Sequence, residues 1–389
     1  MSPIVIKSYA CECALGRTKE ELKANLSAAQ APFMYERSGY LVNGQSLMLG
    51  GVDGPLPEIP EELSAHNSRN NQLLLSCLKQ IEPNINATIE QVSPERFGIV
   101  MGTSTSGLDE ADHKVSNPQE HHWRYPMQEL GDPSRFLQRY LKTTGPAYTI
   151  STACSSSARA VITGIRMLQS GLCDAVLCGG ADTLCRMPIN GFKSLELVSD
   201  VLCAPFAAER KGITIGEGVG LVLLTTEHQG ALSLVGYGES SDAYHVSAPD
   251  PEGKGAERAM RMALENAHLS TQDLGYINLH GTASVMNDQA EACVMERVFG
   301  QSTPCSSTKY LTGHTLGASG IVELCLCALT LEENLPLVPQ DFSQNHLDPN
   351  LPDCGLLTTK GTHLQREFIM TNAFAFGGNN TSLIIKRSV

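Results

Sequence analysis

The order in which short buried strands and helices follow one another constrains this chain more than any other feature of its sequence. Four apolar runs with β-branched residues end in small residues: FGIVMGTS from Phe97, DAVLCGGAD from Asp174, GYINLHG from Gly275 and FIMTNAFAFGG from Phe368. Helical spacing of apolar residues covers 155–169, 255–267 and 317–331. Strands that are apolar along their whole length are buried on both faces. The alternation therefore predicts an α/β sheet with helices on both sides.

An internal echo indicates how the chain is organised. GEGVGLVLLTTE ends near residue 227 and FGGNNTSLIIKR ends near residue 387, and each places a glycine-rich turn before an apolar strand and a polar stop. Two similar halves explain this echo, and chance similarity explains it equally well. On the first explanation the chain divides into residues 1–228, with the candidate nucleophile described below, and residues 229–389, with two candidate histidines.

Composition excludes several classes of protein. The formal net charge of −13 opposes attraction to nucleic acid or to an anionic membrane, and no apolar run reaches the ~18 residues that a membrane span requires. The 13 cysteines are scattered, without a CxxC pair or a nearby histidine, so we expect reduced thiols and no metal site. The first residues do not resemble a secretory signal, and we expect a cytoplasmic protein.

The segment TISTACSSSARAVITGIRML places a cysteine where a strand meets a helix. A β-rich stretch ends in small residues and a helix begins near Ser155, which puts Cys154 at the helix N-terminus. Backbone N–H groups and the helix dipole stabilise a thiolate there, lower the pKa of the thiol and can bind an oxyanion. Cys154 is therefore a candidate nucleophile. The alternative is a buried structural cysteine.

Two histidines lie beside glycine in loops that follow expected strands. NLHGTASVMND contains His280, and STKYLTGHTLGASG contains His314 with Lys309 five residues before it. A neutral imidazole can donate a hydrogen bond to a thioester oxygen as it becomes an enolate, and a nearby ammonium favours that negative charge. A structural or solvent-facing role is the alternative for either histidine alone.

The segment NAFAFGGNN adds a possible oxyanion donor. Its adjacent glycines allow the backbone to approach a ligand closely, and a backbone N–H near Phe376 could complete an oxyanion hole. A plain turn that joins two strands is the alternative.

Taken in chain order, these segments resemble the motifs of the elongating β-ketoacyl-acyl-carrier-protein synthases, the ketosynthases of type I and II in the thiolase superfamily. The resemblance extends over nearly the whole chain: TACSSS resembles the nucleophile loop, HGT and GHTLGA the two histidine loops, and STKYLTGH the lysine segment. It implies a five-layer αβαβα thiolase fold made of two duplicated halves.

The resemblance implies a role for each site residue. Cys154 would carry the acyl thioester, His280 and His314 would stabilise the enolate of a decarboxylated malonyl thioester, and Lys309 would set their electrostatics. The N–H groups of Cys154 and Phe376 would form the oxyanion hole, with the Phe376 ring as a gate. The activity implied is an acyltransferase reaction, a decarboxylative Claisen condensation that gives a β-ketoacyl chain on its carrier.

Four more positions match supporting residues of that family. Thr282 and Ser284 match hydroxyls that contact the phosphopantetheine arm, with serine in place of the usual threonine. Glu323 and Glu217 match acidic residues for which a structural ion pair is the favoured role. No cofactor is expected to be bound, since an acyl carrier protein delivers phosphopantetheine, and the assembly implied is a homodimer or a ketosynthase heterodimer.

Some positions depart from the family pattern. The usual RPFD…RDG appears here as APFAAERKG, so Ala204 replaces an arginine, and Ala207 and Lys211 replace aspartates. Ala375 replaces a glycine in the gate segment. Thr105 falls near a position that bounds the acyl pocket in relatives, often with a larger aliphatic residue, and a plain interface contact is the alternative for it. These departures favour a specialised aryl-polyene or polyketide-type pathway over housekeeping fatty acid synthesis.

Two rival functions belong to other classes. A degradative thiolase acts on CoA thioesters and requires a second catalytic cysteine late in the chain, where Cys354 in LPDCGLL does not resemble the motif. A non-catalytic chain-length-determining partner of a ketosynthase is expected to lack the nucleophile, and Cys154 is present.

Overall fold

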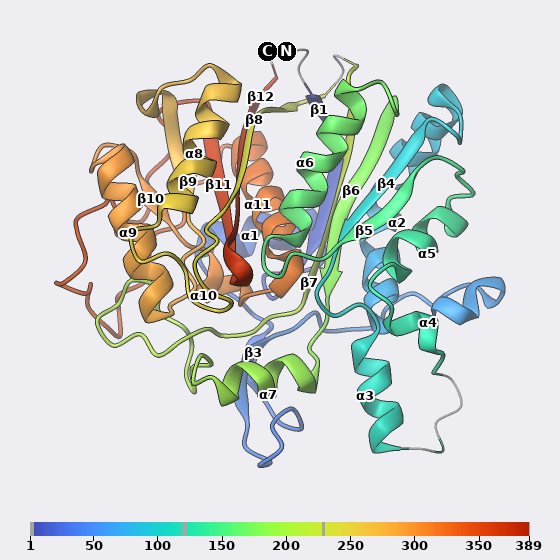
Figure 1. The fold of residues 1–389 in the computed structure, drawn as a ribbon, viewed down its shortest axis with the longest axis horizontal. Helices are drawn as coiled ribbons and strands as arrows, with labels where there is room; N and C mark the ends of the chain where they lie inside the picture. The colour runs from blue at the N-terminus through green and yellow to red at the C-terminus, as the bar shows by residue number, and fades with distance from the viewer. Residues whose placement is uncertain (1–3, 118, 120–122, 228–229, 389) are drawn as a thin grey trace.

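The computed structural model describes residues 4–117, 119, 123–227 and 230–388, and the elements listed below lie within these ranges (Figure 1). The strands of the main sheet are β1 (Ile4–Glu12), β4 (Phe97–Gly102), β5 (Ala147–Ile150), β6 (Ala175–Asp182), β7 (Gly218–Thr225), β8 (Leu232–Ser241), β9 (Leu274–Asn278), β10 (Cys305–Ser306), β11 (Phe368–Ala375) and β12 (Asn379–Arg387). A separate hairpin pairs β2 (Met34–Arg37) with β3 (Leu47–Gly50). The boundary predicted between residues 228 and 229 lies outside the described residues.

The helices alternate with these strands. They are α1 (Lys19–Ala28), α2 (Arg69–Val92), α3 (Leu108–Ser116), α4 (Tyr125–Gln128), α5 (Asp132–Tyr140), α6 (Ser156–Gln169), α7 (Arg186–Ser194), α8 (Lys254–Ala267), α9 (Val285–Phe299), α10 (Lys309–Thr312) and α11 (Ser319–Glu333), with 3₁₀ turns at Glu61–His66, Thr271–Asp273, Leu316–Ala318 and Phe376–Gly378. The four predicted strands and the three predicted helices are all present.

The main sheet contains the same strand arrangement twice. Its order is β10-β9-β11-β12-β8-β1-β7-β6-β4-β5. Reading outward from the central pair, β1-β7-β6 is antiparallel and β6-β4-β5 parallel, and β8-β12-β11 is antiparallel and β11-β9-β10 parallel. Antiparallel pairing of β1 with β8 joins the two sets.

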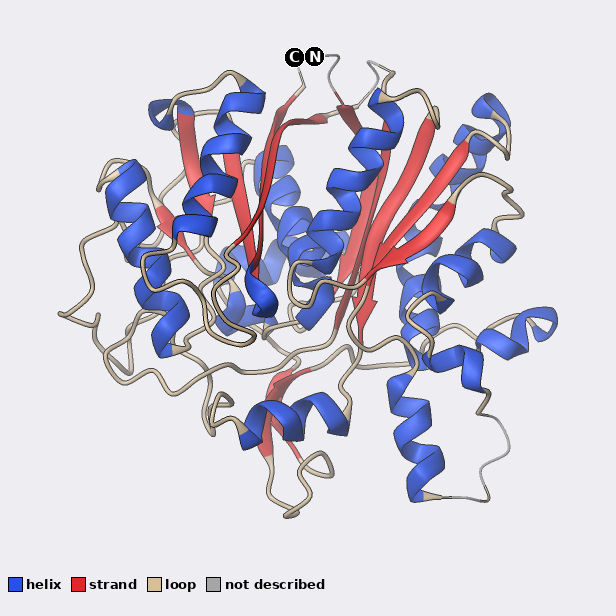
Figure 2. Cartoon of the chain, viewed as in Figure 1, coloured by secondary structure: helices blue, strands red, loops and turns tan. Residues whose placement is uncertain are grey.

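Helices lie between the two strand sets and outside each of them, as Figure 2 shows. Helices α6 and α11 contact each other, α6 packs on β4 and β6, and α11 packs on β7 and β11. Helices α2 and α5 cover the first strand set, whereas α8 packs on β8 and β12 and contacts α9. The layers therefore alternate as α, β, α, β, α. Helix α11 is buried through residues 319–331 because both of its sides face other layers.

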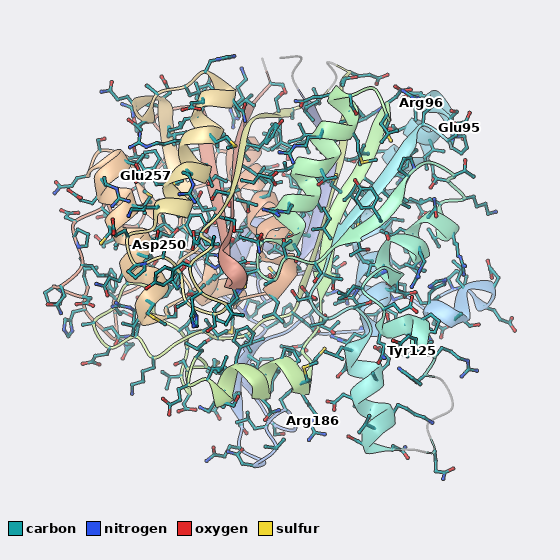
Figure 3. All side chains as sticks on the ribbon, in the orientation of Figure 1. Glu95, Arg96, Tyr125, Arg186, Asp250 and Glu257 are labelled. Atoms are coloured by element: carbon teal, nitrogen blue, oxygen red, sulfur yellow. The ribbon has the colours of Figure 1, made fainter. Side chains whose placement is uncertain are left out.

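Charged side chains also pair between helices. Glu257, labelled in Figure 3, accepts hydrogen bonds from Arg261 in its own helix and from Arg297 in α9. Between β4 and β5 the chain forms α3, α4 and α5, and residues 118 and 120–122 of this stretch lie outside the described residues. Among the described helices, none combines the length and the apolar character needed to cross a membrane.

Candidate active site

Cys154 lies in the turn that joins β5 to α6. The preceding residue, Ala153, has a left-handed backbone with φ of 51°, which turns the chain sharply before the helix begins at Ser156. The thiol is 6% exposed and lines the pocket described below. The turn thus places the sulfur after the edge strand β5 and at the N-terminus of α6, a helix of the central layer.

The environment of this thiol differs from the sequence-based prediction. Burial raises the pKa of Cys154 to about 11, although the Lys309 ammonium and the backbone N–H groups of Phe376 and Cys154 act to lower it. The prediction of a lowered thiol pKa is therefore wrong for the unliganded site, because desolvation outweighs the helix terminus. The sulfur rests as a thiol and has to lose its proton as it attacks.

Both histidines face this sulfur. The Nε2 atom of His314 lies 3.0 Å from Cys154 Sγ, and one donor atom of each of Cys154, His280 and His314 lies within 4.8 Å of the others. The two imidazole rings meet edge to face, with centroids 5.4 Å apart. Burial, followed by the Lys309 ammonium, holds the pKa of each histidine well below its usual value. Both rings are therefore neutral at physiological pH and can donate hydrogen bonds.

Lys309 is fully buried behind the histidines. Its ammonium bonds the carboxylate of Glu323 on α11, which is 1% exposed. Burial raises the pKa of Glu323 to about 7 while Lys309 acts against this rise. A buried ammonium close to the imidazoles keeps them uncharged and favours negative charge in the pocket. The Cys154, His280 and His314 donors are of types that Zn²⁺ binds, but the same ammonium opposes a cation there.

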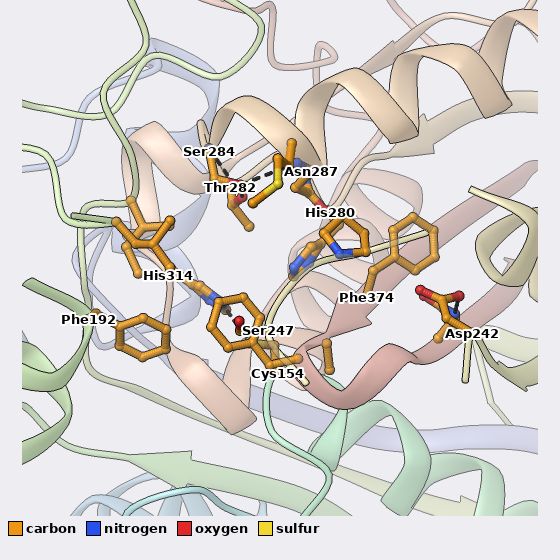
Figure 4. A pocket seen from close by; sticks show the side chains of 17 residues that line it. Cys154, Phe192, Asp242, Ser247, His280, Thr282, Ser284, Asn287, His314 and Phe374 are labelled. Atoms are coloured by element: carbon orange, nitrogen blue, oxygen red, sulfur yellow. Dashed lines mark hydrogen bonds between the residues drawn. The ribbon is translucent and has the colours of Figure 1, made fainter. Parts of the chain in front are cut away.

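A pocket of about 620 Å³, its open mouth included, connects these groups to solvent (Figure 4). Thr282 and Ser284 line it, and the Thr282 hydroxyl donates a hydrogen bond of 3.2 Å to Ser284 Oγ. The lining residues are Cys154, Phe192, Leu197, Ile213, Asp242, Ser247, Pro249, His280, Thr282, Ser284, Met286, Asn287, His314, Phe374, Ala375, Phe376 and Asn380. The hydroxyls and amides of this lining suit a polar arm, and its apolar rings suit an acyl chain.

Phe376 closes the pocket beside the thiol. Its ring packs against Phe192 of α7, with centroids 5.5 Å apart. Two hydrogen bonds to Asp242 fix the turn that carries Phe376: Asp242 N–H donates to Gly378 O at 2.8 Å, and Asn380 Nδ2 donates to Asp242 Oδ1 at 2.7 Å. Sequence reasoning missed Asp242, since a single aspartate after a strand carries no distinctive motif.

Four predicted residues lie outside the pocket lining: Lys309 and Glu323, which pair as described above, and Thr105 and Glu217. The Thr105 hydroxyl donates a hydrogen bond of 2.7 Å to Asp182 Oδ1, and Thr105 is 2% exposed. Glu217 accepts hydrogen bonds from the Arg69 guanidinium and from the backbone N–H of Val52, which joins α2 to the segment before β7. The predicted residues that line the pocket together are Cys154, His280, Thr282, Ser284, His314 and Phe376. The side chains of Thr105 and Glu217 bond residues that do not line it.

The segment APFAAERKG forms an ion pair even though it departs from the usual family pattern. Ala207 is fully buried, and Arg210 donates to Asp348 Oδ2 at 2.7 Å and lies 3.8 Å from Asp288 Oδ2. Lys211 is exposed. An ion pair to another segment of the chain therefore fixes this loop, although alanine replaces the aspartate of the usual pattern.

A second carboxylate shapes the His280 loop and predicts a pH effect. Glu291 accepts the backbone N–H groups of His280 and Gly281, and burial raises its pKa from 4.5 to about 7 against those bonds. Between these two pH values the folded protein keeps a proton that the unfolded chain releases, so stability falls as pH rises. Its contribution to the free energy of unfolding should fall by about 3 kcal/mol across that window.

Urea unfolding of the wild type and of Glu291→Gln at several pH values measures this contribution, because the other titrating groups are common to both proteins. From pH 4.5 to 7, the wild type should lose stability relative to the variant. Parallel pH profiles for the two proteins contradict a neutral Glu291 in the folded state.

A buried thiol faced by two neutral imidazoles, with backbone N–H groups beside it, defines a site for acyl transfer through a cysteine thioester. The chain matches the family models described as Beta-ketoacyl synthase, N-terminal domain, over residues 1–230, and Beta-ketoacyl synthase, C-terminal domain, over residues 232–340. The chain belongs to the β-ketoacyl synthase family.

Individual relatives agree with this assignment. Nodulation protein E of Rhizobium meliloti is 36% identical over 256 residues, and this match spans only 62% of the length of either protein. Nodulation protein E of Rhizobium leguminosarum bv. trifolii is 30% identical over 86% of each chain. The 3-oxoacyl-[acyl-carrier-protein] synthase 2 of Staphylococcus aureus is 29% identical over 82% of each chain.

A solved structure is more similar still. The complex of ketosynthase ApeO with its chain length factor ApeC from Xenorhabdus doucetiae contains a chain that is 54% identical, with a TM-score of 0.97, over 99% of this chain and 98% of that chain. A β-ketoacyl synthase from Burkholderia phymatum gives a TM-score of 0.86 at 25% identity. The predicted family, the five-layer thiolase fold and the predicted class of enzyme, a condensing acyltransferase, are confirmed.

Proposed function

We propose that this protein condenses an acyl group held on Cys154 with a malonyl group on acyl carrier protein, and so extends the chain by one β-keto unit. The observation that supports this most directly is the 3.0 Å contact between Cys154 Sγ and His314 Nε2, with His280 in the same pocket. An acyl-transfer nucleophile and two neutral hydrogen-bond donors are the groups that this reaction requires.

The first half of the reaction loads the enzyme. The Cys154 sulfur attacks the thioester carbonyl carbon, the carbonyl oxygen accepts from the N–H groups of Cys154 and Phe376, and a new C–S bond replaces the bond to the carrier thiol. The thiol proton leaves with the departing carrier sulfur. Hydrogen bonds from both N–H groups act to lower the pKa of the Cys154 thiol, which supports their proposed role as oxyanion donors.

The second half forms the new carbon–carbon bond. Loss of the malonyl carboxylate as CO₂ leaves an enolate whose oxygen accepts hydrogen bonds from His280 and His314. The enolate carbon attacks the Cys154 thioester, the C–S bond breaks, and the released thiolate takes up one proton from solvent. Lys309 lies close enough to lower the pKa of both imidazoles, and its charge also stabilises the enolate.

The substrate arm enters through the polar side of the pocket. Thr282 and Ser284 bond each other there and are placed to bond the amides of a phosphopantetheine arm. That arm belongs to the acyl carrier protein, and the condensation needs no other cofactor. The protein would act in the cytoplasm, where carrier-bound chains are extended.

Similarity to one solved complex supports our proposal for the pathway and the assembly. Identity of 54% to a chain of a ketosynthase–chain length factor complex exceeds the 29% to a 3-oxoacyl-[acyl-carrier-protein] synthase 2. We infer a specialised chain, of aryl-polyene or polyketide type, and a heterodimer with a chain length factor. Strand β5 is the edge of the sheet, and its Tyr148 is 42% exposed, which suits pairing with a partner strand.

The rival functions fit the site less well. A thiolase requires a second cysteine beside the nucleophile, and Cys354 is buried outside the pocket lining, with its carbonyl bonded to Cys305. A silent partner requires no nucleophile, whereas Cys154 faces two imidazoles.

Carrier protein loaded with a radiolabelled acyl group, followed by malonyl-loaded carrier, tests the proposal, with and without a co-expressed chain length factor. We expect label on the protein first and a labelled β-ketoacyl carrier after malonyl addition. Transfer of acyl groups to free CoA with no use of malonyl carrier indicates a thiolase. The absence of labelling in both assemblies contradicts the proposed function.

A further inference from the structure

Asp182, at the end of β6, is a buried carboxylate that the reaction scheme does not use. It is fully buried, and none of the ion pairs found among the described residues includes it. Burial raises the pKa of Asp182, and hydrogen bonds from the 103–105 segment act to lower it. A buried carboxylate without a cation is costly unless several donors satisfy it, so the identity of those donors indicates its role.

One oxygen of this carboxylate gathers the loop that follows β4. Oδ1 accepts the backbone N–H groups of Ser104 and Thr105 at 2.8 and 2.7 Å, and the hydroxyls of Thr103 and Thr105 lie at 2.8 and 2.7 Å. The Thr103 hydroxyl also accepts from the N–H of Ser106 at 2.9 Å. The loop is thus wrapped around a single oxygen atom.

The other oxygen holds the segment that follows His314. Oδ2 accepts the backbone N–H of Ala318 at 3.0 Å, in the 3₁₀ turn that leads into α11. Gly317 lies so close that an added Cβ would be 2.8 Å from Oδ2 and 2.8 Å from Ser104 Oγ. The His314 turn and the 103–106 loop therefore share one anchor.

The nucleophile turn joins the same cluster. The Ser104 hydroxyl lies 3.5 Å from Ala153 O, in the residue before Cys154. Each of the three segments contains a residue with a left-handed backbone: Ser106 with φ of 47°, Leu316 with 50° and Ala153 with 51°. Such conformations cost about 1–3 kcal/mol each in residues other than glycine and persist only where the surroundings fix them.

We propose that Asp182 is a positioning residue, which holds the turns carrying Cys154 and His314 in the register that keeps their reactive atoms in contact. Its two oxygens connect the loop that touches the Cys154 turn with the turn that follows His314. This role rests on the proposed function, because it concerns the geometry of the same reaction. It differs from a binding role, since Asp182 does not line the pocket.

Asp182→Asn is the sharpest test because it keeps the shape of the side chain. If the amide oxygen takes the Oδ1 position, the amide nitrogen meets the Ala318 N–H, and two donors face each other. If the amide is reversed, one NH₂ group meets the four donors of the loop. Either arrangement releases one of the two turns, and a displacement of about 1 Å at reacting groups costs about 100-fold in rate.

We expect kcat for condensation to fall by about 100-fold, whereas KM for the malonyl carrier stays within about twofold because the pocket mouth is unchanged. The control is Glu12→Gln, a carboxylate that is 1% exposed, bonds Arg17 and Gln80, and lies outside the pocket lining. Near-UV circular dichroism and thermal unfolding of both variants separate misfolding from loss of position. Glu12→Gln should keep the wild-type kcat even if it loses as much thermal stability as Asp182→Asn.

Thr105→Val covers the case in which Asp182→Asn does not fold, because it removes one donor from the same oxygen. It should lower kcat and leave KM unchanged, while Thr105→Ser, which keeps the hydroxyl, should restore the rate. A folded Asp182→Asn with wild-type kcat, or a fall in rate only in proportion to its unfolded fraction, overturns the proposal. A wild-type protein that fails to condense in the same assay contradicts the proposed function instead.

Discussion

Replacement of Cys154 by alanine should abolish acylation of the protein. The side chain is the only thiol among the described residues that lines the pocket, and its sulfur lies within 4.8 Å of one nitrogen of each imidazole. Without sulfur there is no acyl-enzyme, so the two-step route is closed and the rate should fall by at least about 10⁴-fold. Intact-protein mass spectrometry after incubation with acyl carrier protein measures the acyl adduct directly.

The matched control is Cys293→Ala. Cys293 lies on α9 outside the pocket lining and is the more accessible thiol, because every other cysteine is buried. It should acylate like the wild type, which separates transfer at the active site from chemical reaction of a more accessible thiol. An acyl adduct on Cys154→Ala of wild-type amount and rate is the result that contradicts the assigned nucleophile.

The sequence predicted the core of this fold and the centre of its site because both rest on local patterns. Apolar runs such as 97–102 and 368–375 form strands that are buried on both faces of the sheet. His280 and His314 each lie beside a glycine, which favours a loop over a strand or helix. That these loops meet Cys154 was a prediction from the resemblance. The 3.0 Å contact between His314 Nε2 and Cys154 Sγ supports it.

Tertiary structure determines what the sequence could not reveal. The pKa of Cys154 depends on the balance between burial and the Lys309 charge, and only the packed site shows that burial prevails. The resemblance placed Thr105 near the acyl pocket, with an interface contact as the alternative, and it gave no sign that the Thr105 hydroxyl bonds Asp182 of another strand. The role of Asp182 itself depends on contacts among three segments that are more than 20 residues apart in sequence, and no local sequence pattern predicts such contacts.

Replacement of His314 by alanine should separate the two halves of the reaction. Its Nε2 atom contacts Cys154 Sγ, but the oxyanion donors of the first half are backbone N–H groups that this change leaves in place. Acylation should therefore persist within about tenfold of the wild-type rate. The enolate loses one of its two imidazole donors, so decarboxylation and condensation should fall by about 10³-fold.

Two assays resolve these halves: intact-protein mass spectrometry for the acyl adduct, and release of labelled CO₂ from malonyl carrier for decarboxylation. His113→Ala serves as the control, because that side chain is 72% exposed and lies on the peripheral helix α3. An equal loss of both activities would assign His314 to deprotonation of the thiol, since the proton of a thiol with a pKa of about 11 needs an acceptor. Preserved acylation with lost decarboxylation supports instead the expected role of His314, donation of a hydrogen bond to the enolate in the second half of the reaction.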